Sequence, residues 1–396
     1  MFLAISEKAP APRAHLSAAL GEEGRAAIGR YLASRPDYRP TPLVPLPALA
    51  AANAIASLHV KDEGQRFGLK SFKALGGAYA VALLVLETAG EKLGRALAPA
   101  DLARPEVQAV ARTMTVACAT DGNHGRSVAW GAKNAGCRAV IFIHGGVSQS
   151  RADQMAAFGA EIRRISGSYD DSVRIAAETA DSEGWTVVSD TSWQGYEAIP
   201  LNVMQGYTAL IGEALDAIPQ SPTHIFVQAG VGGIAAAVAS YAHQRLAEAP
   251  KIAVVEPERA ACLFASASAK AGRPVTIPHG EPTVMAMLEC ATPSPIAFEV
   301  LSHLADGYVT LGEEEAIAAM RRLAEPLGAD QPIVSGESGG TGLAGLLACL
   351  ADAKARSHLG LDPRSRVLVI NSEGATDPAI YSRLVGRSPE QVLEGR

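Results

Sequence analysis

Short strand-like segments alternate with helix-like segments from residue 115 to residue 189. The segments expected to be strands are 115–120, 139–144, 161–165 and 186–189, and those expected to be helices are 125–135, 150–158 and 170–180. This alternation is typical of a parallel sheet, because parallel neighbours need a long crossover connection that a helix usually supplies. Residues 223–228, 252–256 and 367–371 have the same strand character and predict a second sheet. The predicted fold class is therefore α/β.

The chain is long enough to form two domains. Its 396 residues are 48% hydrophobic and 19% charged, so they can bury a large core. We assign residues 1–77 and 203–396 to a large domain and residues 78–202 to a small domain. Each is expected to be an open three-layer α/β/α unit, whereas residues 271–295, rich in Pro and Gly, predict a loop. Open α/β sheets bind ligands beyond the carboxyl ends of their strands, which predicts an active site in the cleft between the domains.

Composition excludes several kinds of partner. The net charge of -6 provides no basic face for nucleic acid or acidic lipid, and the 35 Lys and Arg residues are scattered. We see no signal peptide and no membrane span, so we expect a cytoplasmic protein. The five cysteines lack CxxC or CxxH spacing, which predicts no metal site. Cys262 and Cys290 flank a loop, and a disulfide between them is a minor alternative.

Lys73 follows the segment RFGLKSF, residues 66–72, and opens a long apolar helix. On residue type alone, such a lysine is a capped and solvated side chain. Two later segments favour a functional role: DGNHGR at 121–126 and GVGGI at 230–234 each follow a strand and open a helix, which points backbone N–H groups at an anion. Lys73 is thus placed to anchor an aldehyde cofactor as an imine. Lys70 is expected near the same helical face, pointing to solvent or to a carboxylate.

Taken together, these motifs resemble the fold-type II pyridoxal-phosphate enzymes and, among them, the 2,3-diaminopropionate ammonia-lyases. The resemblance extends from residue 60 to residue 380 and so covers most of the chain. The matching motifs are RFGL (66–69) before FK (72–73), TDGNHGR (120–126), SDTSW (189–193) with GYE (195–197), MQGY (204–207) and QAGVGG (228–233).

The resemblance implies a role for each motif in binding pyridoxal 5'-phosphate. Lys73 would hold the cofactor as an imine and move the proton of the substrate Cα. The glycine-rich turn would hold the phosphate, and Asn123 would bond the ring oxygen, unless it only forms an Asx turn. A hydroxyl after the last strand would meet the pyridine nitrogen, either Ser372, our choice, or Thr376. The implied cofactor-binding residues are Lys73, Phe72, Asn123, Gly230, Val231, Gly232, Gly233, Ile234 and Ser372.

Asp121 is the residue that distinguishes one substrate class from another. Many amino-acid dehydratases of this fold type have Ser or Thr at the corresponding turn, whereas the diaminopropionate lyases have Asp. A carboxylate suits a substrate with a second ammonium, and it can take the Cα proton from the face opposite Lys73. Asp190 resembles a second family aspartate that binds the β-amino group or shifts the ionisation of Asp121 through the repulsion of like charges. Its alternative role is an N-cap for the following turn. The expected catalytic residues are Lys73, Asp121 and Asp190.

The reaction implied by the resemblance is an α,β-elimination. The substrate would be 2,3-diaminopropionate of D and L configuration, and the products pyruvate and two ammonia, in amino-acid catabolism by a homodimer. A serine or threonine dehydratase of the same fold is the alternative enzyme. A third interpretation, from another functional class, is a pyridoxal-phosphate binder without catalysis, with a carrier or regulatory role.

Overall fold

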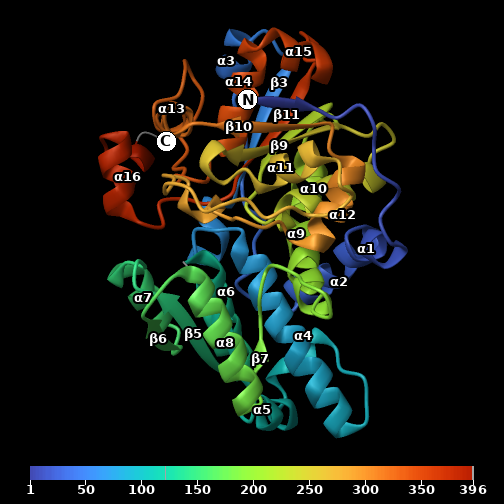
Figure 1. Ribbon diagram of the computed structural model, residues 1–396, viewed down its shortest axis with the longest axis vertical. Coiled ribbons are helices and arrows are strands. Elements are labelled where there is room, and N and C mark those ends of the chain that lie inside the picture. Colours follow the sequence, from blue (N-terminus) through green and yellow to red (C-terminus); the bar gives the residue numbers. More distant parts are fainter. Residues whose placement is uncertain (121, 395–396) are drawn as a thin grey trace. The chain divides into compact units, whose positions relative to one another are not determined.

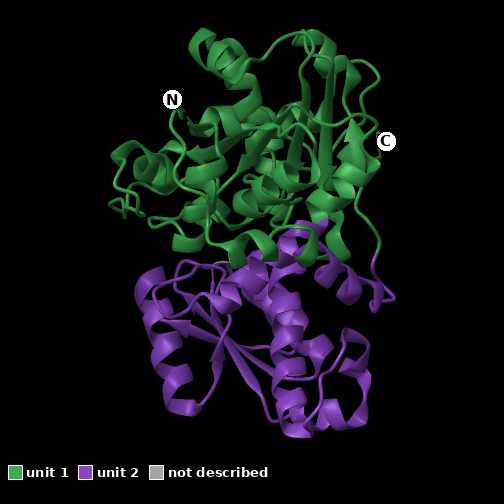
Figure 2. Cartoon of the chain, turned by 90° about the vertical axis from the view of Figure 1, so that its right-hand side faces the viewer, with its two compact units in different colours: residues 1–23, 39–72, 210–396 green, residues 24–38, 73–209 purple. Residues whose placement is uncertain are grey.

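The chain forms two compact units in a computed structural model that describes residues 1–120 and 122–394 (Figure 2). Unit 1 consists of Met1–Glu23, Arg39–Phe72 and Leu210–Arg396, and unit 2 consists of Gly24–Tyr38 and Lys73–Ala209. These units differ from the domains expected from the sequence by a few residues at each junction and by residues 24–38. The domain limits at residues 77 and 202 stay a prediction.

Unit 2 contains a four-stranded sheet in the order β6-β5-β4-β7, in which every neighbouring pair is parallel. Apolar side chains of β4 and β5 pack against α8, where Ala176 and Ala180 are buried. The expected alternation of strands and helices is confirmed, although the last strand has two residues. The strands are β4 (Thr115–Ala119), β5 (Arg138–His144), β6 (Glu161–Ile165) and β7 (Thr186–Val187). The helical segments are α4 (Lys73–Leu93), η2 (Pro99–Ala103), α5 (Pro105–Ala111), α6 (Asn123–Ala135), α7 (Gln149–Ala156) and α8 (Tyr169–Glu183), with most of α2 (Glu22–Ala33) and the first part of α9 (Ala198–Ala217).

Unit 1 contains a seven-stranded sheet in the order β1-β10-β9-β8-β11-β3-β2 (Figure 1). The five inner strands are parallel to one another, whereas the edge strands β1 and β2 run antiparallel to their neighbours. The second parallel sheet is therefore confirmed, but sequence reasoning missed β1, β2 and β10. The edge strands have three residues each, too few to show a hydrophobic period. The strands are β1 (Phe2–Ala4), β2 (Leu43–Pro45), β3 (Ser57–Asp62), β8 (His224–Gln228), β9 (Lys251–Pro257), β10 (Gly307–Leu311) and β11 (Arg366–Asn371).

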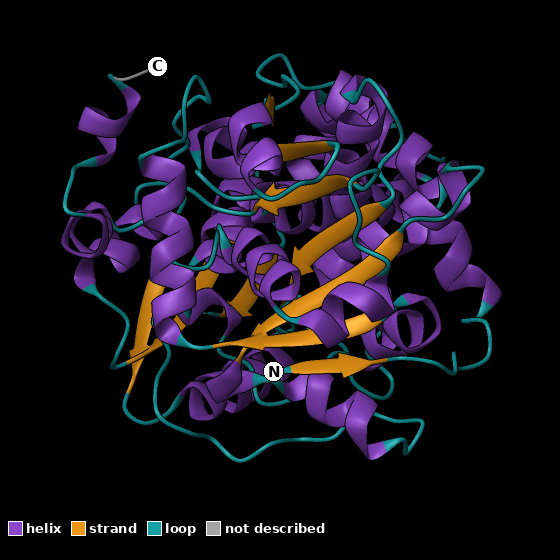
Figure 3. Cartoon of the chain, turned by 90° about the horizontal axis from the view of Figure 1, so that it is seen from above, coloured by secondary structure: helices purple, strands orange, loops and turns teal. Residues whose placement is uncertain are grey.

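Helices cover both faces of the large sheet (Figure 3). On one face Phe226, Val255 and Val369 pack with apolar side chains of α13, α14 and α15. Because strand side chains alternate, Ile225 and Val227 face the opposite side, where α10 packs on β8 and against α12. Residues 271–295 contain a single 3-10 turn and no strand, as expected for a loop. The helical segments are α1 (Ala14–Ala19), α3 (Pro47–Ala52), η1 (Glu63–Gly68), α10 (Gly233–Arg245), η3 (Glu258–Ala260), α11 (Cys262–Ala269), η4 (Ala286–Leu288), α12 (Pro295–Leu304), α13 (Glu313–Ala324), α14 (Thr341–Ala351), α15 (Ala353–Leu359), α16 (Pro378–Val385) and α17 (Pro389–Leu393).

Helix α4, which begins at Lys73, is closely packed against its neighbours. A Cβ on Gly77 would lie 2.7 Å from the Ser127 Oγ of α6, and a Cβ on Gly206 of α9 would lie 2.5 Å from the Leu75 carbonyl oxygen. Glycine is therefore needed at both positions, because any larger residue would push the helices apart. By length and composition alone α4 could cross a membrane, but 67% of its apolar window is buried inside the protein, as in a core helix.

Candidate active site

The Lys73 ammonium forms an ion pair with the Asp190 carboxylate within unit 2. The two side chains are 18% and 19% exposed, so both are largely shielded from water yet still reachable. Burial opposes ionisation of Asp190, but the Lys73 charge and the hydrogen bonds to the carboxylate outweigh it and hold the pKa of that carboxyl well below its usual range. The structure thus brings together two of the three expected catalytic residues and keeps Asp190 charged. The next helix, α9, begins at Ala198, so Asp190 is not at the N-terminus of a helix.

His124 supports the strand end that leads to Asp190. Its Nε2–H donates to the Val188 carbonyl at 2.9 Å, and its Nδ1 lies 3.9 Å from the Asp190 Oδ2. Burial lowers the pKa of the imidazole, which therefore stays neutral with its proton on Nε2. This arrangement agrees with a structural role for His124, since Lys73 already occupies the carboxylate.

The first turn of α4 is fixed by a serine of α6. The Ser127 hydroxyl donates to the Lys73 carbonyl at 2.6 Å and accepts from the Ala78 N–H at 3.1 Å. Because Ser127 is fully buried, the position of the Lys73 backbone depends on the packing of α6 against α4. Sequence reasoning did not identify Ser127, and only its place four residues after Asn123 on the same helix could have suggested it.

Lys70 lies in the turn before α4 and not on the helix. The helix begins at Lys73, and Lys70 has φ +58°, a left-handed conformation that non-glycine residues rarely adopt. Its Nζ donates to the Ala375 carbonyl at 3.2 Å, and its own carbonyl accepts from the Gly374 N–H at 2.9 Å. The expectation that Lys70 shares a helical face with Lys73 is therefore wrong, whereas its side chain is only half-buried. The left-handed turn removes it from the helical register.

Phe72 and Ser372 are joined by a backbone hydrogen bond within unit 1. The Phe72 N–H donates to the Ser372 carbonyl at 3.0 Å, and both residues are buried. The Ser372 hydroxyl accepts from the Gln228 Nε2 at 2.7 Å, so its own proton is directed to another acceptor. That geometry suits donation to a pyridine nitrogen. Gln228 in turn ends β8 and precedes the glycine-rich turn, which links the two predicted cofactor-binding segments.

The glycine-rich turn has the features of a phosphate site. Gly232 has φ +101°, which a side chain rarely allows, and a Cβ on Gly230 would lie 2.9 Å from the Cys290 Sγ. Helix α10 begins immediately afterwards, and its N-cap residue, Gly232, has no side chain that could cap the first N–H groups. These groups carry the positive end of a 13-residue helix and therefore suit an anion such as a phosphate. With the Ser372 hydroxyl, also in unit 1, these donors fit the phosphate and the ring nitrogen of pyridoxal 5'-phosphate. Lys73, in unit 2, has the amine that the aldehyde of this cofactor requires.

The remaining predicted residues lie at the start of α6. Asp121 lies outside the described residues. Asn123 is the first residue of α6 and is 9% exposed. The Thr120 hydroxyl accepts from the N–H groups of Gly122 and Gly125, both at 3.1 Å, and so joins the end of β4 to the first residues of α6. Sequence reasoning missed this role of Thr120, although a threonine directly before a Gly-containing helix start is a common signal.

Arg66, part of the RFGL motif, belongs to a closed network of buried charges in unit 1. Its guanidinium donates to Glu63 at 2.7 and 2.8 Å and to Glu213 at 2.8 and 2.9 Å. Lys61 also donates to Glu213, and all four side chains are at most 3% exposed. Two cations therefore balance two anions, which avoids the large cost of an unpaired buried charge. The motif was noted in the sequence, but its partner Glu213 has no local signal.

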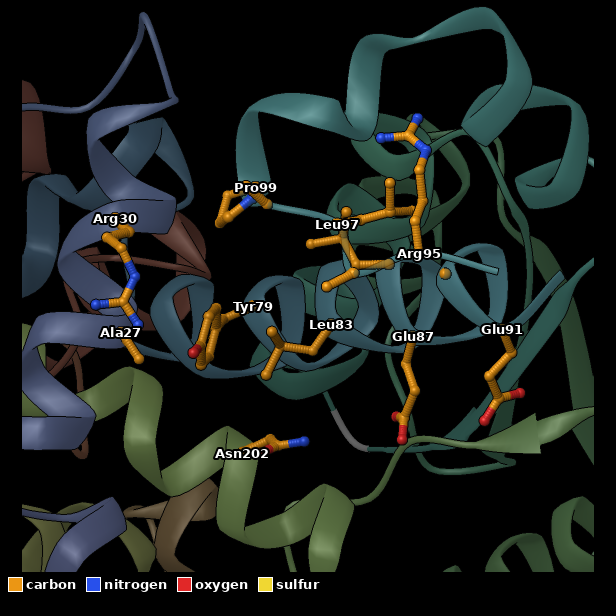
Figure 4. Close-up of a pocket in the computed structure, with 14 residues that line it drawn as sticks. Ala27, Arg30, Tyr79, Leu83, Glu87, Glu91, Arg95, Leu97, Pro99 and Asn202 are labelled. Atoms are coloured by element: carbon orange, nitrogen blue, oxygen red, sulfur yellow. The ribbon is translucent and has the colours of Figure 1, made fainter. Parts of the chain in front are cut away.

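A cavity of about 720 Å³ lies along α4, beyond the turn that carries Lys73 (Figure 4). Tyr79 and Leu83 form part of its wall, together with Arg30 of α2 and Asn202 of α9. Among the residues that the structure describes, no predicted catalytic or cofactor-binding residue lines it. The predicted chemistry therefore depends on the residues around Lys73 and not on this cavity. Cys262 and Cys290 form no disulfide.

Comparison with known proteins gives consistent matches. Residues 34–373 match the family model described as pyridoxal-phosphate dependent enzyme. A diaminopropionate ammonia-lyase from Salmonella typhimurium is 39% identical over 365 residues, which cover 89% of this chain and 90% of that protein. Two crystal structures of diaminopropionate ammonia lyase from Escherichia coli each cover 97% of this chain and 96% of theirs with a TM-score of 0.83. One, 35% identical, contains an aminoacrylate-PLP azomethine reaction intermediate, and the other, 34% identical, contains D-serine.

The fold agrees with these matches, since both sheets are largely parallel and flanked by helices. The predicted imine lysine, the glycine-rich turn and the hydroxyl after the last strand all fall within the matched residues. Because the family model spans most of the sequence and a relative is 39% identical along 89% of it, the chain belongs to the pyridoxal-phosphate dependent enzymes and has their fold-type II architecture.

Proposed function

We propose that this chain converts 2,3-diaminopropionate, of either configuration, to pyruvate and two ammonia by an α,β-elimination that requires pyridoxal 5'-phosphate. The observation that carries the proposal is the pairing of Lys73 with Asp190 in a chain that is 39% identical to a diaminopropionate ammonia-lyase. A lysine that binds the cofactor is expected throughout the family. A carboxylate beside that lysine suits a substrate with a second ammonium.

Pyridoxal 5'-phosphate, when bound, withdraws electrons from the substrate Cα and makes its proton acidic. Lys73 holds the cofactor through Nζ, and its released amine takes the Cα proton from one face. Asp121 takes the proton from the opposite face, a role that rests on its motif alone. Two bases on two faces account for turnover of both configurations.

Asp190 binds the β-ammonium of the substrate. Its carboxylate is charged at neutral pH, and it lies close enough to Lys73 to be reached by a group two bonds from the reacting carbon. As the Cα–H electron pair forms the Cα–Cβ double bond, the Cβ–N bond breaks and ammonia leaves with its electron pair. Asp190 holds the nitrogen in place until that step. The aminoacrylate that remains is hydrolysed by water after its release, which gives pyruvate and the second ammonia.

The other cofactor-binding residues hold and orient the pyridoxal phosphate. The phosphate is bound by backbone N–H groups at the start of α10. These N–H groups belong to Gly233 and Ile234 and to the preceding turn, which consists of Gly230, Val231 and Gly232. The Ser372 hydroxyl meets the pyridine nitrogen, because its oxygen already accepts from Gln228 and its proton is available. Asn123 binds the ring oxygen, and Phe72 contacts the cofactor next to Lys73.

The proposal extends to the setting of the enzyme. We infer a cytoplasmic homodimer that acts in amino-acid catabolism and takes only a small amino acid as its partner. The net charge of -6 supports the absence of a nucleic-acid or lipid partner. Light scattering on the purified protein tests the dimer, which requires a mass of twice 41.0 kDa.

The experiment that tests the function compares pyruvate release from D- and L-2,3-diaminopropionate with release from D-serine, L-serine and L-threonine. Faster turnover of both diaminopropionate enantiomers is expected. A preference for serine or threonine would instead identify a dehydratase of the same fold. Cofactor absorbance without turnover of any amino acid would identify a binding protein.

A further inference from the structure

The Tyr196 hydroxyl joins two backbone groups of the strand end that carries Asp190. It donates to the Val187 carbonyl at 2.8 Å and accepts from the Ser189 N–H at 3.0 Å. The carbonyl of the residue between them, Val188, is held by His124. Side chains therefore fix the backbone at three successive residues directly before Asp190.

The Tyr196 ring is itself held in place. It stacks on the Trp193 ring with centroids 4.0 Å apart and an interplanar angle of 12°. The two residues also exchange backbone hydrogen bonds of 2.9 and 3.2 Å, which close the turn between them. Burial raises the pKa of the Tyr196 hydroxyl, so it keeps the proton that it donates to Val187.

Asp190 has a short side chain with two rotatable bonds, so the position of its carboxylate follows its backbone closely. The backbone of the preceding residue, Ser189, depends on Tyr196. Loss of the Tyr196 hydroxyl leaves both the Ser189 N–H and the Val187 carbonyl without this partner. The strand end can then shift, and the Asp190 carboxylate shifts with it.

We propose that Tyr196 is a positioning residue that sets substrate preference by holding Asp190 where it meets the β-ammonium of diaminopropionate. The proposal deepens the function proposed above and rests on it. A hydroxy-amino acid has no β-ammonium, so its binding depends less on the Asp190 carboxylate. Tyr196 therefore contributes to selection between the two substrate classes without touching either.

The test is Tyr196→Phe, which removes one oxygen and keeps the ring stacked on Trp193. We expect KM for diaminopropionate to rise about three- to tenfold, the effect of losing one or two hydrogen bonds, with a much smaller change in the affinity for D-serine. The D-serine affinity is measured as KM or as an inhibition constant. The matched control is Tyr381→Phe in unit 1, a fully buried tyrosine whose hydroxyl has no hydrogen-bond partner in the described part of the chain.

Hydrogen–deuterium exchange of the cofactor-free protein provides a readout that needs no activity. The amides of residues 187–190 should exchange faster in Tyr196→Phe than in the wild type. In Tyr381→Phe their exchange rates should equal those of the wild type. Equal losses for diaminopropionate and D-serine, or unchanged exchange at residues 187–190, would overturn the proposal. If the proposed diaminopropionate lyase function is wrong, the wild-type protein by itself will show it, because it will turn over serine or threonine but not diaminopropionate. The exchange arm then still decides whether Tyr196 fixes the strand end.

Discussion

Arg66 and Glu213 are 147 residues apart in the sequence and are joined by two hydrogen bonds of 2.8 and 2.9 Å inside unit 1. Glu213→Gln leaves two buried cations, Arg66 and Lys61, facing a single carboxylate. We expect the variant to lose about 3 kcal/mol of unfolding free energy, because removing one member of a buried ion network leaves an uncompensated charge. Urea unfolding of the cofactor-free protein measures it.

Glu106→Gln is the matched control for this loss. Glu106 pairs with Arg95 at 3.0 Å, but both side chains are more than 40% exposed. An exposed pair contributes at most about 1 kcal/mol. Equal stability of Glu213→Gln and Glu106→Gln would show that the buried network is not a major source of stability.

Asp190→Asn should reduce turnover of diaminopropionate far more than turnover of D-serine. The amide cannot offer a negative charge to the β-ammonium, and a hydrogen bond to a charged group is stronger than a neutral one. We therefore expect kcat/KM for diaminopropionate to fall about tenfold or more. Steady-state kinetics with both substrates measures the ratio. Asp181→Asn on the exposed side of α8 controls for the loss of one surface charge. A similar loss with both substrates would assign Asp190 to the support of Lys73 instead.

Much of the fold could be predicted from the sequence because its signals are local. The parallel sheet of unit 2 follows from segments that alternate between residues 115 and 189, and the loop at 271–295 follows from its Pro and Gly content. The inner strands of the second sheet are predicted by the strand character of each segment on its own, although they lie far apart in the sequence. The edge strands β1 and β2 could not be predicted, because three residues show no period. Their pairing is set by neighbours far away in the sequence: Phe2 pairs with Val309.

Candidate site residues could be named from the sequence where a motif marks a single residue. Residues whose role arises from packing were missed. Lys73 and Asp190 each stand in a motif, and the structure brings them together. The contacts that position them come from the hydroxyls of Ser127 and Tyr196, which bond backbone groups. Tyr196 lies in the GYE motif, but the motif alone assigns no role to its hydroxyl. Lys70 was misplaced because a helical register was extended past the true start of α4.

Gly232→Ala should weaken binding of pyridoxal 5'-phosphate. Gly232 has φ +101°, and an added Cβ would lie 3.2 to 3.4 Å from three buried side chains, so the phosphate turn must distort. A left-handed conformation costs a non-glycine residue about 1–2 kcal/mol, which corresponds to a loss of affinity of about tenfold. Titration of the cofactor-free protein, followed by cofactor absorbance, measures the affinity.

Gly360→Ala separates this effect from a general loss of stability. Gly360 also has a positive φ, +70°, but a Cβ there would meet nothing within 4 Å, and it ends α15. It should destabilise the fold by a similar amount without changing cofactor affinity. Unchanged affinity in Gly232→Ala would mean that the phosphate binds elsewhere.

Glu256 should make the protein less stable as the pH rises from about 5 to 8. The side chain is fully buried, and burial raises the pKa of its carboxyl to about 8, against about 4.3 in an unfolded chain. Between these values the folded state binds a proton that the unfolded state has lost, so the unfolding free energy falls with increasing pH. Glu256→Gln has no such proton, and its stability should depend less on pH across this window. Urea midpoints of both proteins at pH 5, 6.5 and 8 test this. The N–H groups of Leu263 and Phe264, at 2.8 and 2.7 Å, favour the charged form. If they outweigh burial, the two proteins will instead show parallel pH profiles.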